Sequence, residues 1–264
     1  MPLLFLVLEI IWIKGCTRMV SIISPSIMMK EVDDNHKNLT IPVYIEKTKE
    51  IVDKINSMSD EEMSKLMVID GDLLRINRFR YNKFRFDSNG SPAILSYTGS
   101  VYKNINANVF DINDIEFCKE HIRILSGLYG ILRPYDSIYE YRLELKSKLR
   151  IGKFKDLYGY FGECIYQNLV KHDREILNLC SNEYSKAIIP YLCSKDMFIT
   201  CSFKIKRNNI IKSYAMDSKI TRGKMVNFII KNKIDKYEML KEFDDNGYLF
   251  DKALSNKYEY VFTK

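Results

Sequence analysis

Two short segments of the chain concentrate side chains that could do chemistry on an anionic molecule. In the first, Arg133, Asp136, Arg142 and Glu144 fall within twelve residues. Guanidinium groups bind carboxylates and phosphates through paired hydrogen bonds, and carboxylates can transfer protons. These charges can form the wall of a site, or a buried ion-pair network that only orients the loop. Because Arg142 and Glu144 are two positions apart, an extended strand would place both on one face.

The second segment follows an expected strand and contains Ser181, Glu183, Tyr184 and Lys186. Functional groups often lie at the carboxyl ends of strands. A Ser–Lys or Tyr–Lys pair could do acid–base work if the lysine were desolvated. Alternatively, Ser181 caps the next helix, with Glu183 in its first turn, where the helix dipole favours a carboxylate. From both segments we take Asp136, Glu144, Glu183 and Lys186 as catalytic candidates.

Basic residues are densest in one later stretch of the chain. The stretch contains Lys204, Lys206, Arg207, Lys212, Lys219, Arg222 and Lys224. If these side chains faced one cleft, they would neutralise phosphates and give salt-dependent, sequence-independent binding of nucleic acid. A solvated charged face is the alternative. The formal net charge of +7, from 41 Lys and Arg against 34 Asp and Glu, suits an anionic partner, but an AT-rich genome would also favour lysine codons.

The elements that must position these residues follow from hydrophobic periodicity and capping signals. The spacing predicts strands at 20–23, 92–97, 176–180, 247–250 and 258–262, helices at 45–58, 60–77, 113–124, 155–171 and 219–233, and a hairpin turning at Asn208 and Asn209. Ser59 and Glu62 form a capping-box signature for the second helix. Strands and helices mix without strict alternation. We therefore expect an α+β (mixed α/β) fold, a single compact domain with a central mixed sheet flanked by helices.

Composition excludes several classes of protein. With 28% charged and 46% hydrophobic residues among 264, the chain has an ordinary globular balance. The six cysteines form no CxxC pair and the three histidines are far apart, so we expect free thiols in a reducing cytoplasm, no metal site and no cofactor. The phosphate-loop, GxGxxG, GxSxG and HExxH patterns do not occur.

Within the first eighteen residues, Pro2 to Ile13 form an apolar run interrupted by Glu9. The run is shorter than the roughly 20 residues that span a membrane, and no positive segment precedes it. Met19 begins a strand-like segment followed by a Ser-Pro turn. We expect residues 1–18 to be a misassigned extension, and residues 19–264 to form the domain.

A series of motifs in fixed order resembles the YaaA peroxide-stress family. They are IISPS from Ile22, YTGSVY from Tyr97, LSGLYGILRPYD from Leu125, YRLE from Tyr141, KDLYGYFG from Lys155, LCSNEYSK from Leu179, RGKMVNFI from Arg222 and GYLF from Gly247. The likeness covers nearly all of the chain after Met19. One departure concerns the Ser-Pro turn, since the family has a lysine two residues after Ser-Pro, where this chain has Ile27 and reaches Lys30 three residues later.

This resemblance implies a cytoplasmic, monomeric protein of the peroxide-stress response that helps to limit free intracellular iron. It also implies DNA binding through a basic cleft and an element like a helix-hairpin-helix. For DNA or another anion, the candidate residues are Arg133, Arg142, Lys204, Lys206, Arg207, Arg222 and Lys224. The alternative is an enzyme acting on a small anionic or nucleotide-like substrate in the same cleft; no membrane partner is expected.

The segment from Leu125 to Asp136 contains the turn residues Gly127, Gly130 and Pro134, and Gly99 lies in an earlier motif. Glycines permit tight turns and close approach of backbone, so the segment could form a phosphate-binding hairpin followed by Arg133. Helix-hairpin-helix glycines are usually two apart, whereas these are three apart. The alternative is that both glycines serve a helix C-cap and a close packing contact.

Overall fold

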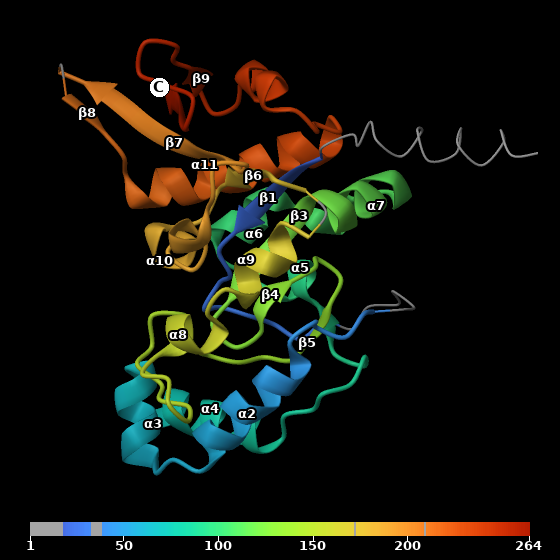
Figure 1. Ribbon diagram of the computed structural model, residues 1–264, viewed down its shortest axis with the longest axis vertical. Coiled ribbons are helices and arrows are strands. Elements are labelled where there is room, and N and C mark those ends of the chain that lie inside the picture. The colour runs from blue at the N-terminus through green and yellow to red at the C-terminus, as the bar shows by residue number, and fades with distance from the viewer. Residues whose placement is uncertain (1–17, 33–38, 172, 209) are drawn as a thin grey trace, which may run out of the picture.

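A central sheet organises the computed structural model, which describes residues 18–32, 39–171, 173–208 and 210–264 (Figure 1). Its strands lie in the order β4-β3-β1-β6-β7-β10-β9, and β8 pairs with β7. Their bounds are β1 Met19–Ile23, β3 Ile122–Ser126, β4 Gly130–Leu132, β6 Glu175–Asn178, β7 Met197–Arg207, β8 Ile210–Lys212, β9 Leu249–Phe250 and β10 Glu259–Thr263. The mixed sheet and its flanking helices confirm the expected fold class.

The middle of this sheet is parallel. β1 pairs in parallel with both β3 and β6, β6 with β7, and β7 with β10, whereas β4, β8 and β9 are antiparallel to their neighbours. In the register, Ser21 lies opposite Leu177 and Ile122. Since parallel strands end at the same edge, the loops that follow β1 and β6 are brought together.

Helices of different lengths surround the sheet. They are α2 Ile45–Asn56, α3 Asp60–Met67, α4 Gly71–Asn82, α5 Ala93–Ser96, α6 Ser100–Ile105, α7 Ile112–His121, α8 Leu157–Phe161, α9 Cys164–Leu169, α10 Asn182–Ser185 and α11 Ala215–Lys231, with short 3₁₀ turns η1 Ala107–Val109, η2 Ile189–Tyr191 and η3 Tyr237–Glu242. The helix α11 packs closely on α6 because Gly223 has no side chain. A Cβ there would lie 2.2 Å from the Val101 carbonyl oxygen.

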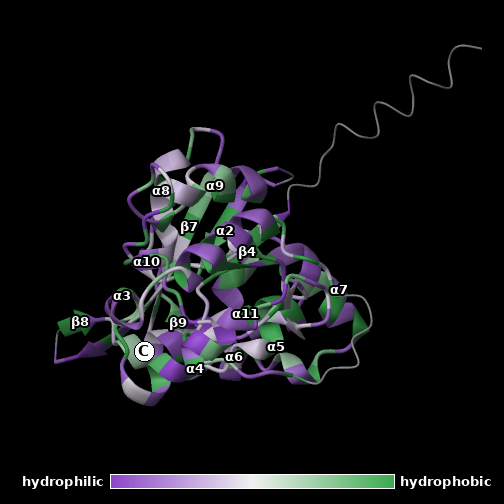
Figure 2. Ribbon diagram, turned by 90° about the horizontal axis from the view of Figure 1, so that it is seen from below, coloured by the Kyte–Doolittle hydropathy of each residue, from purple (hydrophilic) through white to green (hydrophobic). Residues whose placement is uncertain are grey.

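The two ends of the molecule differ in content. Figure 1 places α2, α3 and α4 at one end of the long axis, and β7, β8 and β9 at the other. A two-stranded sheet of β2 Ser91–Pro92 and β5 Ser137–Ile138 links α5 to the segment after β4. In Figure 2, β8 projects from the rest of the molecule and is coloured hydrophobic, as expected from Ile210 and Ile211, which are 52% and 42% exposed.

Several predicted elements are correct in kind but end where a residue adopts a left-handed backbone. The capping box of Ser59 and Glu62 is present, but the predicted helix 60–77 is two helices, broken at Val68 (φ 54°) and Gly71 (φ 49°). The predicted helix 155–171 is likewise α8 and α9, broken at Gly162 (φ 51°). Positive φ angles interrupt the helical hydrogen bonds, and periodicity does not reveal them.

Two other predictions were wrong. Residues 92–97 form little strand, since α5 occupies Ala93–Ser96. The helix predicted at 113–124 is capped instead by Asp111, ends at His121, and continues directly into β3. The apolar run from Ile122 is buried on both faces of the sheet, and a buried strand cannot be distinguished from a helix by such a run. The hairpin at Asn208 (φ 48°) and strands β6, β9 and β10 agree with the sequence.

The segment containing Gly127 and Gly130 forms the antiparallel turn between β3 and β4, not a turn between helices. A Cβ at Gly127 would lie 2.4 Å from the Leu143 carbonyl oxygen, and Gly130 (φ 72°) packs against the Phe161 ring. The close packing contact expected as the alternative is therefore present, whereas the helix C-cap is not. A pair of helices joined by a short turn does occur elsewhere among the described elements, at α3 and α4.

Candidate functional site at the strand ends

A cavity of about 510 Å³, lined by both apolar and charged side chains, lies at the carboxyl ends of β1 and β6. We call it the strand-end cavity. Its walls come from four stretches that are far apart in sequence: residues 24–28 after β1, 99–102 at the start of α6, 179–184 after β6, and one face of α11. Glu144 also lines it. Each stretch belongs to one of the motifs noted in the sequence, so the fold collects these motifs around one cavity.

A pair of serines fixes the floor of the cavity. The Ser181 backbone N–H donates to the Ser24 hydroxyl oxygen at 2.9 Å, and the two hydroxyls are 3.4 Å apart. The Tyr102 hydroxyl donates to the Ser24 carbonyl oxygen at 2.9 Å. Ser181 occupies the N-cap position of α10, but its side chain makes no capping hydrogen bond. The alternative of a helix-capping hydroxyl is therefore wrong for this side chain, which faces Ser24 instead.

Gly99 lets two of the walls approach. A Cβ at this position would lie 2.5 Å from the Ser26 hydroxyl oxygen. Gly99 has an ordinary φ of −66°, so the requirement is space and not backbone strain. The neighbouring Ser100 also lines the cavity. The glycine in the YTGSVY motif is thus explained by this contact.

Arg222 provides positive charge from α11. Its Nε atom is buried and has no hydrogen-bond partner among the described residues. Burial lowers the pKa of this guanidinium from its ordinary value, and the neighbouring thiols Cys180 and Cys201 oppose that shift. A desolvated guanidinium with an unused donor can bind an anion strongly, because few water molecules must be displaced.

The opposite wall carries negative charge. Glu183 Oε1 is buried without a hydrogen-bond partner in the described structure, while Oε2 lies 3.3 Å from Lys146 Nζ. Lys146 also lies 3.1 Å from Glu144 Oε1. These contacts, first the hydrogen bond with Glu144, raise the pKa of Lys146. One lysine therefore holds the two carboxylates that line the cavity.

The loop after β1 presents an apolar residue to the cavity where the family has a lysine. Ile27 is 45% exposed and lines the strand-end cavity, whereas Lys30 lies outside it. Positive charge at the cavity comes instead from Arg222 and Lys219. With Glu144 and Glu183 opposite, the lining is balanced in charge. It suits a ligand that has both an anionic group and hydrogen-bond donors.

The structure separates the other predicted residues from this cavity. Arg133 and Asp136 lie at a different recess: the Asp136 carboxylate accepts from the Arg133 backbone N–H at 2.8 Å, from Arg133 Nε at 2.9 Å and from Thr40 Oγ1 at 2.6 Å. Burial raises the pKa of Asp136 despite these hydrogen bonds. This arrangement matches the alternative of an ion-pair network that orients the loop.

Arg142 shares a small recess with Glu144, beside the strand-end cavity. The two residues lie on the same side of the chain, as predicted, because the alternating residues Tyr141 and Leu143 are buried; the segment forms no named strand. Lys186 is exposed and is absent from the cavity lining. It therefore forms no Ser–Lys or Tyr–Lys pair inside the cavity. Burial raises the pKa of the Tyr184 phenol.

The basic stretch does not gather around one cleft. Three of its lysines are ion-paired: Lys204 with Glu259 at 3.4 Å, Lys206 with Asp251 at 2.5 Å and Lys224 with Asp245 at 2.6 Å. Arg207 and Lys212 are exposed on the β7–β8 hairpin, and Arg222 lies in the strand-end cavity. Reasoning from residue types alone missed Ser24, Ser26 and Ser100 as site residues. Their only signal was their place in the Ser-Pro and TGS motifs.

In the described ranges, no group of three or more His, Cys, Asp and Glu side chains could hold a metal ion. Within the same ranges, no helix is both long and apolar enough to cross a membrane. Cys118, Cys180 and Cys201 are buried free thiols, and burial raises the pKa of Cys180 to about 12, whereas Cys193 is exposed. The prediction that residues 1–18 are a misassigned extension concerns residues that lie almost wholly outside the described ranges.

The fold and the cavity define a mixed α/β protein with a cavity at the ends of parallel strands. The model of the family described as peroxide stress protein YaaA matches residues 19–254. The chain is 45% identical to a UPF0246 protein of Clostridioides difficile, over 93% of this chain and 100% of that protein. It is 36% identical to a UPF0246 protein of Agathobacter rectalis and 37% identical to one of Desulfitobacterium hafniense, each over 92% of this chain. The chain belongs to the YaaA (UPF0246) family of peroxide stress proteins.

Proposed function

We propose that this peroxide stress protein works through the strand-end cavity, where it binds a small anion that also carries hydroxyl or amino groups. One observation carries the proposal: Arg222 and Glu183 line the same cavity, and each has a buried polar atom without a partner in the described structure. Buried polar groups in native proteins are nearly always satisfied. Both atoms are closed off from solvent in this structure, so each side chain would turn toward the cavity to meet an anionic group at Arg222 and a donor at Glu183.

The same geometry supports an enzymatic role. A ligand anchored by its anionic group at Arg222 would place its hydroxyl or amino groups near Glu183 and Glu144. Either carboxylate can accept a proton from such a group, which is the contribution of a general base. The Ser24 hydroxyl lies at the floor of the cavity and would orient the ligand.

A titration of the purified protein tests this proposal. Inorganic phosphate, ribose 5-phosphate and the nucleoside monophosphates are titrated by calorimetry. We expect one of them to bind, with affinity reduced at least tenfold in Arg222→Gln and in Glu183→Gln. Lys186→Gln is the matched control, because Lys186 is exposed three residues from Glu183 and outside the cavity. Equal loss in the control, or no binding of any compound, contradicts the proposal.

A second function, binding of the DNA backbone, is favoured by the β7–β8 hairpin. The hairpin projects from the molecule, and neither Arg207 nor Lys212 has a carboxylate partner in the parts of the chain that are described (Figures 1 and 2). In the described ranges no ion pair competes for these two cations, so we propose a small number of phosphate contacts.

Fluorescence anisotropy with labelled duplex DNA at 50–300 mM salt measures this second function. Binding should weaken as the salt concentration rises. The logarithm of the binding constant should fall linearly with the logarithm of the salt concentration, with a slope of about −0.9 per phosphate contact. Arg207→Gln and Lys212→Gln should each reduce that slope by about one, while Lys186→Gln leaves it unchanged. A flat salt response, or no binding at low salt, rules out this function.

We further propose, on the family resemblance, that the protein acts in the cytoplasm as a monomer and helps to limit free iron during peroxide stress. Electron paramagnetic resonance of chelated iron in whole cells tests the iron role. Cells lacking the protein should hold more free iron under peroxide, and the wild-type gene should bring the free-iron level back down. Restoration by Lys186→Gln but not by Arg222→Gln would connect the effect to the strand-end cavity.

A further inference from the structure

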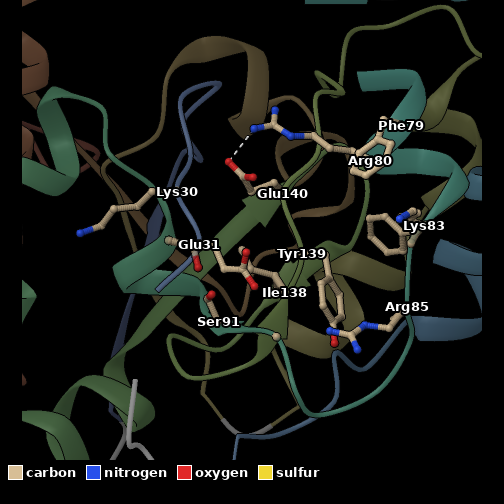
Figure 3. Close-up of a pocket in the computed structure, with 13 residues that line it drawn as sticks. Lys30, Glu31, Phe79, Arg80, Lys83, Arg85, Ser91, Ile138, Tyr139 and Glu140 are labelled. Atoms are coloured by element: carbon tan, nitrogen blue, oxygen red, sulfur yellow. Dashed lines mark hydrogen bonds and ion pairs between the residues drawn. The ribbon is translucent and has the colours of Figure 1, made fainter. Parts of the chain in front are cut away.

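A second cavity, of about 360 Å³, lies on another part of the molecule between α4 and the segments around Glu31 and Tyr139 (Figure 3). None of its lining residues lines the strand-end cavity. Its volume falls within the range of small-molecule sites in proteins. No motif that points to the family accounts for it, since its lining comes from α4 and the turn that follows, and from residues 30–31, 90–96 and 138–140, all of which lie outside those motifs.

Aromatic rings form one wall of this cavity. Phe84 is fixed from behind by the core: its ring centroid is 6.1 Å from Tyr81 and 5.8 Å from Tyr139, the latter edge-on. Phe79, in the last part of α4, is 59% exposed and also lines the cavity. The cavity thus has a rigid aromatic wall with an open aromatic edge, which suits a flat ring.

Cations lie against these rings. Lys83 Nζ is 4.6 Å from the centroid of Phe79, and the Arg85 guanidinium is 5.1 Å from the centroid of Tyr139. Figure 3 shows Arg85 beside the Tyr139 ring. In the described ranges neither cation forms an ion pair, whereas Arg80 at the far rim is neutralised by Glu140 at 2.6 Å. Arg85 also hydrogen-bonds to the Tyr139 hydroxyl, and its charge adds to the hydrogen bond from Tyr139 in lowering the pKa of Asp87. Lys83 keeps its hydrogen-bond donors for an anion, and the Arg85 guanidinium has further N–H groups for the same anion.

The remaining wall offers an acceptor. Glu31 is exposed to the cavity near Ser91 and Tyr139, and no hydrogen bond or ion pair engages its carboxylate in the described structure (Figure 3). Asp87, which accepts a hydrogen bond from the Tyr139 hydroxyl, is held behind that ring. A free carboxylate opposite an aromatic wall can accept hydrogen bonds from the edge of a nucleobase or from sugar hydroxyls.

We propose that this cavity binds a mononucleotide. Its base lies against Phe79 and Phe84, and its phosphate lies at Lys83 and Arg85. Glu31 accepts hydrogen bonds from the amino groups of the base or from the ribose hydroxyls. Stacking on an aromatic side chain is tolerant of base identity. The site therefore selects molecules that carry both a base ring and a phosphate. This site is independent of the function proposed for the strand-end cavity.

Calorimetric titration of the full chain with AMP, GMP, CMP, UMP and ribose 5-phosphate tests the proposal. We expect at least one nucleotide to bind at least tenfold more tightly than ribose 5-phosphate, which lacks the base. Phe79→Ala and Lys83→Gln should each weaken that binding at least tenfold. The matched controls are Ile76→Ala and Arg75→Gln, exposed positions on the same helix outside the cavity, and they should change it less than twofold.

Four results would overturn the proposal. They are the absence of nucleotide binding, ribose 5-phosphate binding as tightly as the nucleotides, equal losses in the Ile76 and Arg75 controls, and a nucleotide whose binding is lost in Arg222→Gln but kept in Phe79→Ala. The last result would place the nucleotide in the strand-end cavity. Because Phe79 and Lys83 are exposed, these variants should fold, and circular dichroism spectra matching the wild type verify it.

Discussion

The backbone N–H of Ser181 donates a hydrogen bond to the hydroxyl of Ser24 at 2.9 Å and ties together the loops that follow two adjacent parallel strands. The residues are 157 positions apart in sequence. The bond closes the floor of the strand-end cavity between the Ser-Pro turn and the SNEY segment. It therefore joins the IISPS and LCSNEYSK motifs into one structural unit.

Replacing Ser24 by alanine should therefore destabilise the protein, since it leaves the Ser181 N–H without its acceptor. We expect the free energy of unfolding to fall by about 1 kcal/mol. Ser26→Ala is the control, because the Ser26 hydroxyl accepts only a local bond from the Met28 N–H, and should cost less than about 0.5 kcal/mol. Urea denaturation followed by circular dichroism measures both. Equal losses would show that the link between the loops contributes nothing specific.

Arg222→Met should leave the stability of the protein unchanged or raise it by about 1 kcal/mol. The guanidinium is partly desolvated and has an unpartnered Nε, so an apolar side chain of similar length removes an electrostatic cost. Lys224→Met, on the same helix, breaks the 2.6 Å pair with Asp245 and should cost up to about 1 kcal/mol. Thermal denaturation of the two variants gives the comparison. A large loss in Arg222→Met would mean that Arg222 is structural.

Gly127→Ala should be the more damaging of two glycine substitutions. The added Cβ would meet the Leu143 carbonyl oxygen at 2.4 Å and the adjacent backbone, which cannot move aside, so we expect a loss of about 3 kcal/mol. Gly159 lies in α8, and its added Cβ would make only ordinary contacts, the nearest at 3.5 Å. Gly159→Ala should be neutral or stabilise by about 0.5 kcal/mol. Similar losses in guanidinium denaturation would contradict the packing argument.

The stability of the protein should fall in acid through Asp114. Burial opposes ionisation of this carboxyl, but hydrogen bonds from Lys231 and Lys233 outweigh it and lower its pKa from 3.8 to about 2. A depressed folded-state pKa stabilises the protein above the ordinary pKa, and that contribution is lost as the pH falls from about 4 to about 2. In Asp114→Asn, unfolding curves recorded across this window should show a weaker dependence on pH. An unchanged dependence would assign the acid sensitivity to other carboxyls.

The sequence by itself determined the family, the mixed α/β class, the Ser59 capping box and the hairpin at Asn208. All of these rest on local residue types, on capping and turn chemistry, or on motifs in fixed order. It also placed Glu144, Glu183 and Arg222 among the candidates.

Only the tertiary structure decided which candidates meet. Sheet order brings the loops after β1 and β6 together, and the packing of α11 on α6 adds Arg222. Ion pairs engage Arg133 and three lysines of the basic stretch elsewhere. Helix breaks at Val68, Gly71 and Gly162 were equally hidden, because a left-handed residue leaves the hydrophobic period intact. Contacts between residues more than a hundred positions apart depend on strand order and close packing, which no local pattern encodes.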